Sequence, residues 1–421
     1  MCPAKPALKV DEPDFGTDPA PIPLPETPAK GAAHAPMPTA GTGLTLAMAA
    51  ATGIAVANIY YNQPMLGVME RDLGSPEWTG LIPTATQLGY AAGLFLLVPL
   101  GDLMDRRRLI AGQFVLLAIA LMLVAVAPTA GLVIAASLAL GACSTVAQQI
   151  VPFAAALAEP ARRGKTIGLV MSGLLCGILL SRTVAGFVAG HFGWREMFWA
   201  AAPVALAAAG AMAWLLPRRT PHQAISYATA LRSLLTLWRE QPGLRRATGV
   251  QASMFASFSV FWTVLALHLQ EPHFHLGATA AGLFGLVGVV GVMAAPFSGR
   301  IADRRGPEGA IAMGIVLVIV SWLLFGLWDS VAGLTVGVIL FDFGLQAVLV
   351  SNQHIVYALV PEARSRLNTV FMTGIFIGGA IGSAGASFAW AHGGWTAVSL
   401  FGGALALIGL SIEFGGRWLR R

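Results

Sequence analysis

The sequence predicts an all-α membrane protein with twelve transmembrane helices, arranged as two six-helix bundles with pseudo-two-fold symmetry. Composition gives the first reason: of 421 residues, 56% are hydrophobic and only 11% are charged, whereas soluble domains carry about 25% charged residues. The second reason is a series of twelve apolar stretches. The third is an internal repeat at about half the chain length, which is typical of membrane bundles built by duplication.

Each apolar stretch is long enough to cross the hydrocarbon core of a bilayer, which takes about 20 helical residues. Charged residues or Pro- and Gly-rich turns separate the stretches, as in the turn at 128–131. The expected spans are 44–69, 79–100, 109–127, 131–157, 166–190, 196–216, 247–269, 277–298, 309–327, 331–359, 367–391 and 395–414.

The basic residues test this count, because Lys and Arg collect in cytoplasmic loops. With both termini inside, 23 of the 26 basic residues fall in cytoplasmic segments, and a wrong number of spans would scramble this alternation. The exceptions are Arg71 and Arg195 on the outer side and Arg182 within a span. The sequence therefore predicts that the N- and C-termini are both cytoplasmic.

The breaks divide the chain into domains. Residues 1–43 contain ten of the 25 prolines and no apolar run, which predicts a disordered cytoplasmic tail. An N-terminal bundle at 44–216 and a C-terminal bundle at 247–416 follow, separated by a cytoplasmic linker at 217–246. A basic cytoplasmic tail covers 417–421.

The linker is expected to contain an amphipathic helix, because its apolar residues recur at helical spacing beside Arg232 and Arg239. Such a helix can lie on the anionic inner leaflet or pack against the cytoplasmic ends of the bundles, and the pattern leaves both open. The apolar positions are Ile225, Ala228, Leu231, Leu235 and Trp238.

The repeat is clearest in the loops after the second and eighth spans. Residues 101–106 read Gly-Asp-Leu-Met-Asp-Arg, and 198 residues later 299–304 read Gly-Arg-Ile-Ala-Asp-Arg. Trp194 and Trp395 end another pair of matching segments, and the offsets across each half stay between 198 and 202. One six-helix unit has therefore been used twice.

Twelve spans in two sets of six, with G-x-x-x-D-R after spans two and eight, resemble the major facilitator superfamily from about residue 44 to the end. The resemblance implies a secondary active transporter in which two bundles rock about a midplane site. The local sequences Asn-Ile-Tyr-Tyr-Asn-Gln-Pro at 58–64 and Gly-Trp-Arg-Glu at 193–196 are similar to those of bacterial sugar, nucleoside and drug efflux permeases. They imply a place in the bacterial inner membrane and proton-coupled export.

In that superfamily the G-x-x-x-D-R loop acts as a cytoplasmic latch that breaks when the transporter opens inward. Glycine permits close helix approach, the carboxylate can sit against the N-terminus of a facing helix, and the arginines hold the loop at the interface. The alternative is a set of topogenic charges beside an incidental Asp. By resemblance the latch residues are Gly101, Asp105 and Arg106 in the first copy and Gly299, Asp303, Arg304 and Gly306 in the second.

Two ionisable residues lie inside spans, where charge is costly and function is the default hypothesis. Asp342 falls near the middle of span ten, where burial favours a neutral carboxyl that can take up and release a proton; its alternative is a structural Asp between helices. Arg182 falls in span five, where it can bind an anionic group or act as a counter-charge. Its alternative is snorkelling toward the outer interface.

Span one is unusually polar between positions 58 and 63. Because this span lines the central cavity in the superfamily, we expect substrate contacts from Asn58, Tyr61 and Gln63, and Gln346 adds an amide in span ten. The competing interpretations are tyrosines at the membrane interface and amides that tie helices together.

No metal site or cofactor is expected. His268, Glu271, His273 and His275 lie close together in sequence between spans seven and eight. A short Pro-containing loop does not guarantee that such ligands converge. Solvated loop residues are the expected outcome.

The expected function is proton-coupled efflux of a small organic molecule such as a drug, sugar or metabolite. Proton-coupled uptake is the alternative, and a non-transporting receptor is a remote one. The chain contains no G-x-x-x-x-G-K-[ST] loop and no hydrolase motif, so we expect no ATPase and no enzyme. The expected partners are a small-molecule substrate, protons and the lipid bilayer, with no nucleic acid, and the protein is expected to work as a monomer.

Overall fold

A computed structural model of the chain describes residues 41–218, 226–292 and 306–418, and every regular element in these ranges is a helix. The tail expected at 1–43 lies almost wholly outside the described residues, as does most of the basic tail at 417–421. Three residues of the second latch copy, Gly299, Asp303 and Arg304, also lie outside them.

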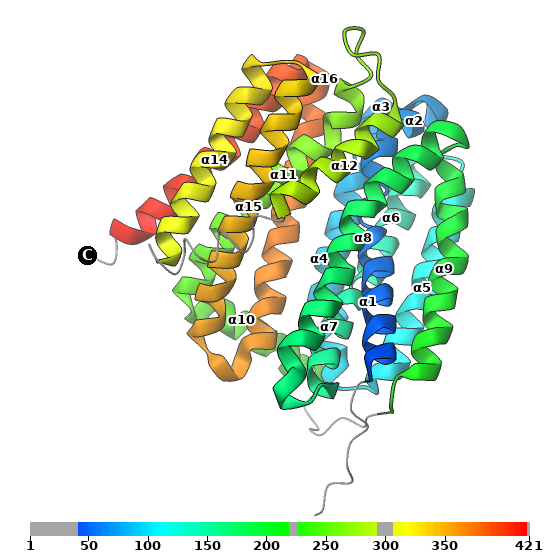
Figure 1. Ribbon diagram of the computed structural model, residues 1–421, viewed down its shortest axis with the longest axis vertical. Coiled ribbons are helices and arrows are strands. Elements are labelled where there is room, and N and C mark those ends of the chain that lie inside the picture. Colours follow the sequence, from blue (N-terminus) through cyan, green and yellow to red (C-terminus); the bar gives the residue numbers. More distant parts are fainter. Residues whose placement is uncertain (1–40, 219–225, 293–305, 419–421) are drawn as a thin grey trace, which may run out of the picture. The chain divides into compact units, whose positions relative to one another are not determined.

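The N half of the bundle precedes α10 in the chain (Figure 1). Its helices are α1 (Thr42–Ala57), α2 (Asn62–Leu73), α3 (Pro76–Thr79), α4 (Ile82–Leu96), η1 (Val98–Asp102), α5 (Arg106–Val126), α6 (Ala130–Ser144), α7 (Val146–Leu157), η2 (Pro160–Arg162), α8 (Arg163–His191) and α9 (Trp194–Leu215). The C half follows the linker helix α10 (Tyr227–Glu240). Its helices are α11 (Pro242–His268), α12 (Ala278–Val292), α14 (Pro307–Leu327), α15 (Val331–Leu359), η3 (Pro361–Ala363) and α16 (Arg364–Trp418).

Ten helical segments among the described residues are long and apolar enough to cross a membrane. One of them, α16, has 55 residues and bends at Gly393 and Gly394, where the backbone leaves helical φ and ψ. The bend falls between the expected spans 367–391 and 395–414. Counting α16 as two spans and adding the shorter apolar helix α12 accounts for all twelve expected spans.

The helix ends follow from local sequence. Asp105 begins α5 by accepting a hydrogen bond from the backbone N–H of Arg107 at 3.0 Å, and Ser330 begins α15 by accepting one from Gly333 at 3.1 Å. Both satisfy N–H groups that the first turn of a helix leaves unpaired. Prolines occupy the first position of α11 and α14, where no N–H is needed.

Each half is built around its own apolar core, and in Figure 1 the N half lies on the right and the C half on the left. The N-half core extends into the C half through Phe371 and Phe376 of α16 and Leu244 of α11. Helix α12 runs beside α8 of the other half. There the backbones approach closely: a Cβ on Gly186 would lie 2.4 Å from the carbonyl oxygen of Ala278.

The two ends of the bundle are named here by the helices that mark them: the α3 end, at the top of Figure 1, and the α10 end, at the bottom. At the α10 end, Leu234 of α10 is buried in the N-half core, and Leu231 and Leu237 pack against it. Leu235 and Trp238, on another face of α10, are exposed. Packing on the bundle therefore uses one apolar strip of the linker helix and leaves a second strip uncovered.

Candidate functional site

Arg182 of α8 is a cation buried deep in the bundle interior, with 3% of its surface exposed. Its Nε donates a hydrogen bond to Oε1 of Gln63 in α2 at 3.0 Å. The guanidinium carbon lies over three aromatic rings, 4.1 Å from the centroid of Trp262, 4.5 Å from Tyr60 and 5.4 Å from Phe258. Because aromatic faces attract cations, these rings offset part of the lost hydration of Arg182.

Asp342 of α15 is also buried, with 8% of its surface exposed. Helix α12 borders both charges. A Cβ on Gly288 would lie 2.5 Å from Oδ2 of Asp342, and a Cβ on Gly285 would lie 3.0 Å from the Cβ of Arg182. Positions three apart share a helix face. One glycine-lined face of α12 therefore meets the acid of the C half and the base of the N half.

The two charges interact electrostatically. Within the described residues, however, they form no direct ion pair, and the only ordered polar partner of the Arg182 side chain is Gln63. Each charge therefore partly offsets the burial of the other without locking it in place, and both can respond to a group that comes between or beside them.

Several buried polar atoms near this point lack a partner among the described residues. Two are donors, Nη2 of Arg182 and Nε1 of Trp262, and two are acceptors, Oδ1 of Asn58 and Oδ1 of Asn62. Buried polar groups normally find partners, and unmet ones are costly. Their gathering along span one and around Arg182 is what a binding site for a polar molecule requires. We call Tyr60, Gln63, Arg182, Trp262 and Asp342 the central site.

The other residues expected in span one have different settings. Asn58 is buried and donates to the carbonyl of Ile54 in its own helix at 2.7 Å. Tyr61 packs edge-on against Phe198 of α9, with ring centroids 6.4 Å apart, whereas its neighbour Tyr60 contacts Arg182. Gln346 lies one turn beyond Asp342 on α15 and is half-buried.

The aromatic residues around Arg182 were not predicted as functional residues from the sequence. Phe258 and Trp262 are four residues apart on the continuous helix α11, so their shared face was a usable signal. For Tyr60 no such signal existed, because span one breaks between Ala57 and Asn62. The break shifts the helical phase of the polar cluster.

The first latch copy forms a compact loop at the α10 end. A Cβ on Gly101 would lie 2.3 Å from Oε1 of Gln149, so glycine leaves room for this side chain of α7. Arg106 donates from Nε to the carbonyl of Gly101 at 2.9 Å and pairs with Asp102 at 2.9 Å. Asp105 caps α5, the helix that it begins. In the second copy, Gly306 is described and has a φ of 77°, which favours glycine.

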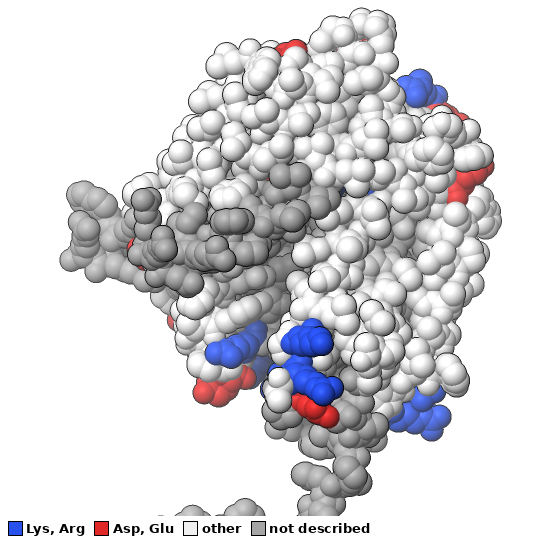
Figure 2. All heavy atoms as spheres, in the orientation of Figure 1, with Lys and Arg blue, Asp and Glu red and all other residues white. Residues whose placement is uncertain are grey.

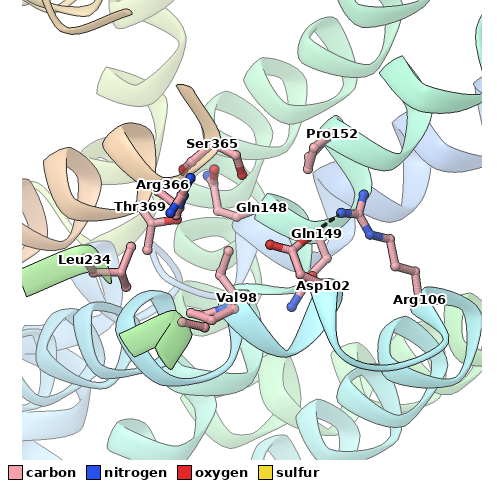
Figure 3. Close-up of a pocket in the computed structure, with 12 residues that line it drawn as sticks. Val98, Asp102, Arg106, Gln148, Gln149, Pro152, Leu234, Ser365, Arg366 and Thr369 are labelled. Atoms are coloured by element: carbon pink, nitrogen blue, oxygen red, sulfur yellow. Dashed lines mark hydrogen bonds and ion pairs between the residues drawn. The ribbon is translucent and has the colours of Figure 1, made fainter. Parts of the chain in front are cut away.

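The latch loop lies beside a pocket shared by both halves and the linker (Figure 3). Asp102 and Arg106 face Gln148 and Gln149 of α7, and across the pocket stand residues of α16 and α10. The C-half and linker lining consists of Ser365, Arg366, Thr369, Ala230 and Leu234. The latch is thus placed where relative movement of the halves at the α10 end would alter its surroundings.

The prediction that the histidine-rich segment is solvated is wrong for His268. It is the last residue of α11 and is fully buried, with both ring nitrogens within hydrogen-bonding distance of carboxylates: Glu271 at 2.7 Å and Asp329 at 2.9 Å. No sequence pattern pointed to Asp329, which approaches from the turn between α14 and α15.

An all-helical bundle with two halves and a buried site of opposite charges between them defines a class, the membrane transporters. The model of the Major Facilitator Superfamily matches residues 48–321 and 247–421. The chain is 40% identical over 377 residues to the uncharacterized transporter YgaY of Escherichia coli O157:H7, covering 89% of this chain and 95% of that one. It is 33% identical to a probable transporter of Streptomyces coelicolor, covering 93% and 92%.

Solved structures agree on the fold. A point mutant of the nucleoside transporter NupG superposes with a TM-score of 0.71 at 15% identity and covers 88% of this chain and 98% of its own. The human organic anion transporter MFSD10 superposes with a TM-score of 0.64 at 17% identity, covering 89% and 100%. The protein belongs to the major facilitator superfamily. It is an integral multi-pass membrane transporter, not an enzyme, and the fold class predicted from the sequence is confirmed.

Proposed function

We propose that the protein is a proton-coupled secondary transporter that exports a small organic molecule by alternating access. The observation that carries the proposal is the pairing of Arg182 in the N half with Asp342 in the C half. Both are buried and electrostatically coupled, and neither is locked in a direct ion pair within the described part of the chain. Ionisable groups held this way inside a membrane bundle are the usual elements of proton relays.

The physical argument rests on charge balance. When Asp342 is ionised, the central site is neutral overall, because its charge offsets that of Arg182. When Asp342 carries a proton, the positive charge of Arg182 is left without its acidic counterpart. Because the two residues belong to different halves, protonation changes the attraction between the halves. This change can shift the equilibrium between the conformations that rock about a midplane site.

Export is the favoured direction. It is supported by the similarity of the segments at 58–64 and 193–196 to bacterial efflux permeases. The first of these segments supplies Tyr60 and Gln63 to the central site. In an exporter of this kind, proton and substrate compete for the same site, so that each leaves as the other binds.

Uptake by symport is the second candidate, and one observation favours it. The buried donors without a partner among the described residues, Arg182 Nη2 and Trp262 Nε1, suit an acceptor-rich group such as a carboxylate. An organic acid would bind Arg182 best when Asp342 is protonated. Proton and substrate would then travel together.

The orientation belongs to the same proposal. We place the α10 end in the cytoplasm of a bacterial inner membrane, because Lys and Arg gather there. Figure 2 shows blue side chains at the lower end of the molecule and an almost uncharged middle. Basic residues favour the cytoplasmic side. The first latch copy, with Gly101 and Arg106, then lies on the side where the transporter must open to take up its cargo for export.

A proton-flux assay tests coupling and direction together. The full chain is reconstituted in liposomes that contain a pH-sensitive dye, and organic acids, organic cations, sugars and nucleosides are added outside one at a time. An exchanged proton leaves as substrate enters and makes the lumen alkaline, whereas a cotransported proton makes it acidic. We expect alkalinisation with at least one compound, and acidification would establish the symport alternative.

The variant Asp342→Asn tests whether Asp342 carries the exchanged proton. It removes the titrating group at nearly constant volume, so we expect substrate-driven proton movement to disappear. Glu362→Gln is the control, because Glu362 is an exposed carboxylate in η3, outside the central site. Proton movement that persists in Asp342→Asn, or that is lost equally in both variants, would remove the proposed role of Asp342.

A further inference from the structure

At the α3 end of the C half, three segments bring metal-ligating side chains together. His268 ends α11, His273 lies in the loop before α12, and Asp329 lies in the turn between α14 and α15. One ligand atom from each residue lies within 4.8 Å of the other two. The cluster shares no residue with the central site, although His268 lies six residues beyond Trp262 on α11.

The ring of His268 is held in one orientation. It stacks on Trp395, with ring centroids 3.9 Å apart and planes 4° from parallel. Its Nδ1 lies 2.7 Å from Oε2 of Glu271. These two contacts fix the ring and direct Nε2 toward Asp329, whose Oδ1 lies 2.9 Å away.

A neutral imidazole has one proton too few to donate to both of these carboxylates. A neutral ring carries a single N–H and can donate to only one carboxylate. If Glu271 accepts that hydrogen bond, the lone pair of Nε2 points at an oxygen of Asp329 across 2.9 Å, and the two acceptors repel. The contact becomes favourable when a cation lies between them or when His268 itself is protonated.

His273 supplies a third ligand to the same point. Its Nε2 lies 3.2 Å from Oδ2 of Asp329. Tetrahedral Zn²⁺ binds nitrogen and oxygen at about 2.0–2.2 Å, which places neighbouring ligands about 3.4 Å apart. In the structure two of these separations are 2.9 Å and 3.2 Å, so the ligand atoms would have to move slightly apart to hold an ion. His273 and Asp329 keep 46% and 40% of their side-chain surface exposed, so the ligands can adjust and water can reach a fourth position.

We propose that His268, His273 and Asp329 form a binding site for a divalent transition-metal ion of the Zn²⁺ class. Two imidazoles and one carboxylate are the donor set that such ions prefer, with an open fourth position. Glu271 completes the site from behind by holding the Nδ1 proton of His268, as carboxylates commonly do for metal-bound histidines.

The position of the site suggests what the ion does. It would join the end of α11, the 269–277 loop and the α14–α15 turn, which are otherwise linked by hydrogen bonds and side-chain packing. Gln270 in the same loop accepts a hydrogen bond from Arg71 and packs against Gly67 of the N half. An ion bound beside Gln270 therefore stiffens the segment through which the two halves touch at the α3 end.

The test uses the full chain in detergent, purified through an affinity tag without histidine and washed with EDTA. We expect calorimetric titration with ZnCl₂ to show one equivalent bound and a raised thermal unfolding temperature, with no such effect from MgCl₂. Asp329→Ala and His273→Ala should abolish this binding. Glu271→Gln should weaken it by about 10- to 100-fold. The control is His275→Asn, because His275 is exposed, stands outside the cluster and has a φ of 52° that Asn tolerates.

A second measurement keeps the proposal open to refutation if a variant does not fold. Co²⁺ added to the wild-type protein should give the strong visible bands of a tetrahedral site, and Zn²⁺ should remove them. Unchanged Zn²⁺ binding in Asp329→Ala, or equal loss in His275→Asn, would overturn the proposal. So would wild-type protein that binds no Zn²⁺ and only gains stability as the pH falls, because a proton on His268 would then explain the cluster.

Discussion

At the α3 end, each half has a bend in the backbone just before a tryptophan, which we call its corner. The charged residues in the two corners differ. Trp194 and Trp395 are counterparts in the repeat, and each follows a glycine with positive φ, 112° at Gly193 and 57° at Gly394. In the N half, Trp194 donates from Nε1 to Asp72 at 3.0 Å, and Arg195 pairs with the same carboxylate. In the C half, Trp395 stacks on His268 instead.

The difference shows that duplication preserved the backbone corner and left its charge free to change. Arg195 is a permanent cation, so the charge of this corner does not change near neutral pH, but both members of its ion pair are partly exposed and are screened by salt. His268 is buried between two carboxylates, and in the proposed metal site an ion would lie between its Nε2 and Asp329. The N-half corner therefore keeps its charge near neutral pH, whereas the proposed ion would change the charge of the C-half corner.

The α10 end shows a second contrast of this kind. In the C half, Arg246 at the start of α11 donates three hydrogen bonds to the fully buried Glu413 of α16, the shortest at 2.9 Å, and lies 3.6 Å from Glu308 of α14. In the N half, the first helix α1 contains no charged residue. The first long helix of the C half is thus held by a buried ion pair at this end, whereas the first helix of the N half has no charge to pair.

Breaking this pair should have the largest effect on stability. Arg246→Ala removes the cation that is hydrogen-bonded to the fully buried Glu413, which costs about 3–5 kcal/mol. The double variant Arg246→Met, Glu413→Leu should recover most of that loss, because an apolar pair of similar volume is often neutral in place of a buried ion pair. Chemical unfolding in detergent measures both, and a single variant as stable as wild type would contradict the contrast between the halves.

The second-largest loss of stability is expected for His268→Ala. It removes a buried ring and leaves the carboxylates of Glu271 and Asp329 facing each other across the gap, at a cost on the order of 2 kcal/mol. The matched change in the N half is Asp72→Ala, which removes a half-exposed carboxylate and should cost less. Thermal unfolding of the two variants, each prepared in EDTA, makes the comparison. Equal losses would show that the C-half corner is not the more buried connection.

The span pattern could be predicted because lipid imposes it. Apolar length and the placement of arginines are dictated by the bilayer and are visible residue by residue, so the expected ends of span ten, 331 and 359, coincide with those of α15. The bend at Gly393 and Gly394 likewise falls in the gap expected between the last two spans.

The chemistry of the sites could be predicted only in part. Asp342 and Arg182 could be chosen as candidates because charge inside a span is rare. Whether Tyr60 or Tyr61 contacts Arg182 depends on the break in span one, and the hydrophobic periodicity of the sequence does not show how that break turns the chain. Asp329 lies 61 residues from His268, and only the packing of the α14–α15 turn on the end of α11 brings them together. Such convergence is a property of tertiary structure.

The two tryptophans give a finer comparison of the corners. Trp395→Phe removes the hydrogen bond that Nε1 of Trp395 donates to the buried carbonyl of Phe325 at 2.8 Å. It also weakens the stacking on His268. Trp194→Phe removes one hydrogen bond to Asp72, which keeps its ion pair with Arg195 and is reached by water. We expect a loss of about 1–2 kcal/mol for Trp395→Phe and about 0.5 kcal/mol for Trp194→Phe. Unfolding measurements that reverse this order would show that the N-half corner is the tighter one.

Removing the Arg195 cation should have the smallest effect. The ion pair with Asp72 is partly exposed, with 31% of the Arg195 side chain and 47% of the Asp72 side chain accessible, so Arg195→Ala should cost about 0.2–1 kcal/mol. Because exposed pairs are screened, the difference from wild type should shrink in high salt. The Arg246→Ala loss should keep most of its size there, since Glu413 is fully buried. Salt-dependent unfolding of both variants therefore separates the exposed connection of the N half from the buried pair of the C half, and parallel salt curves would refute that distinction.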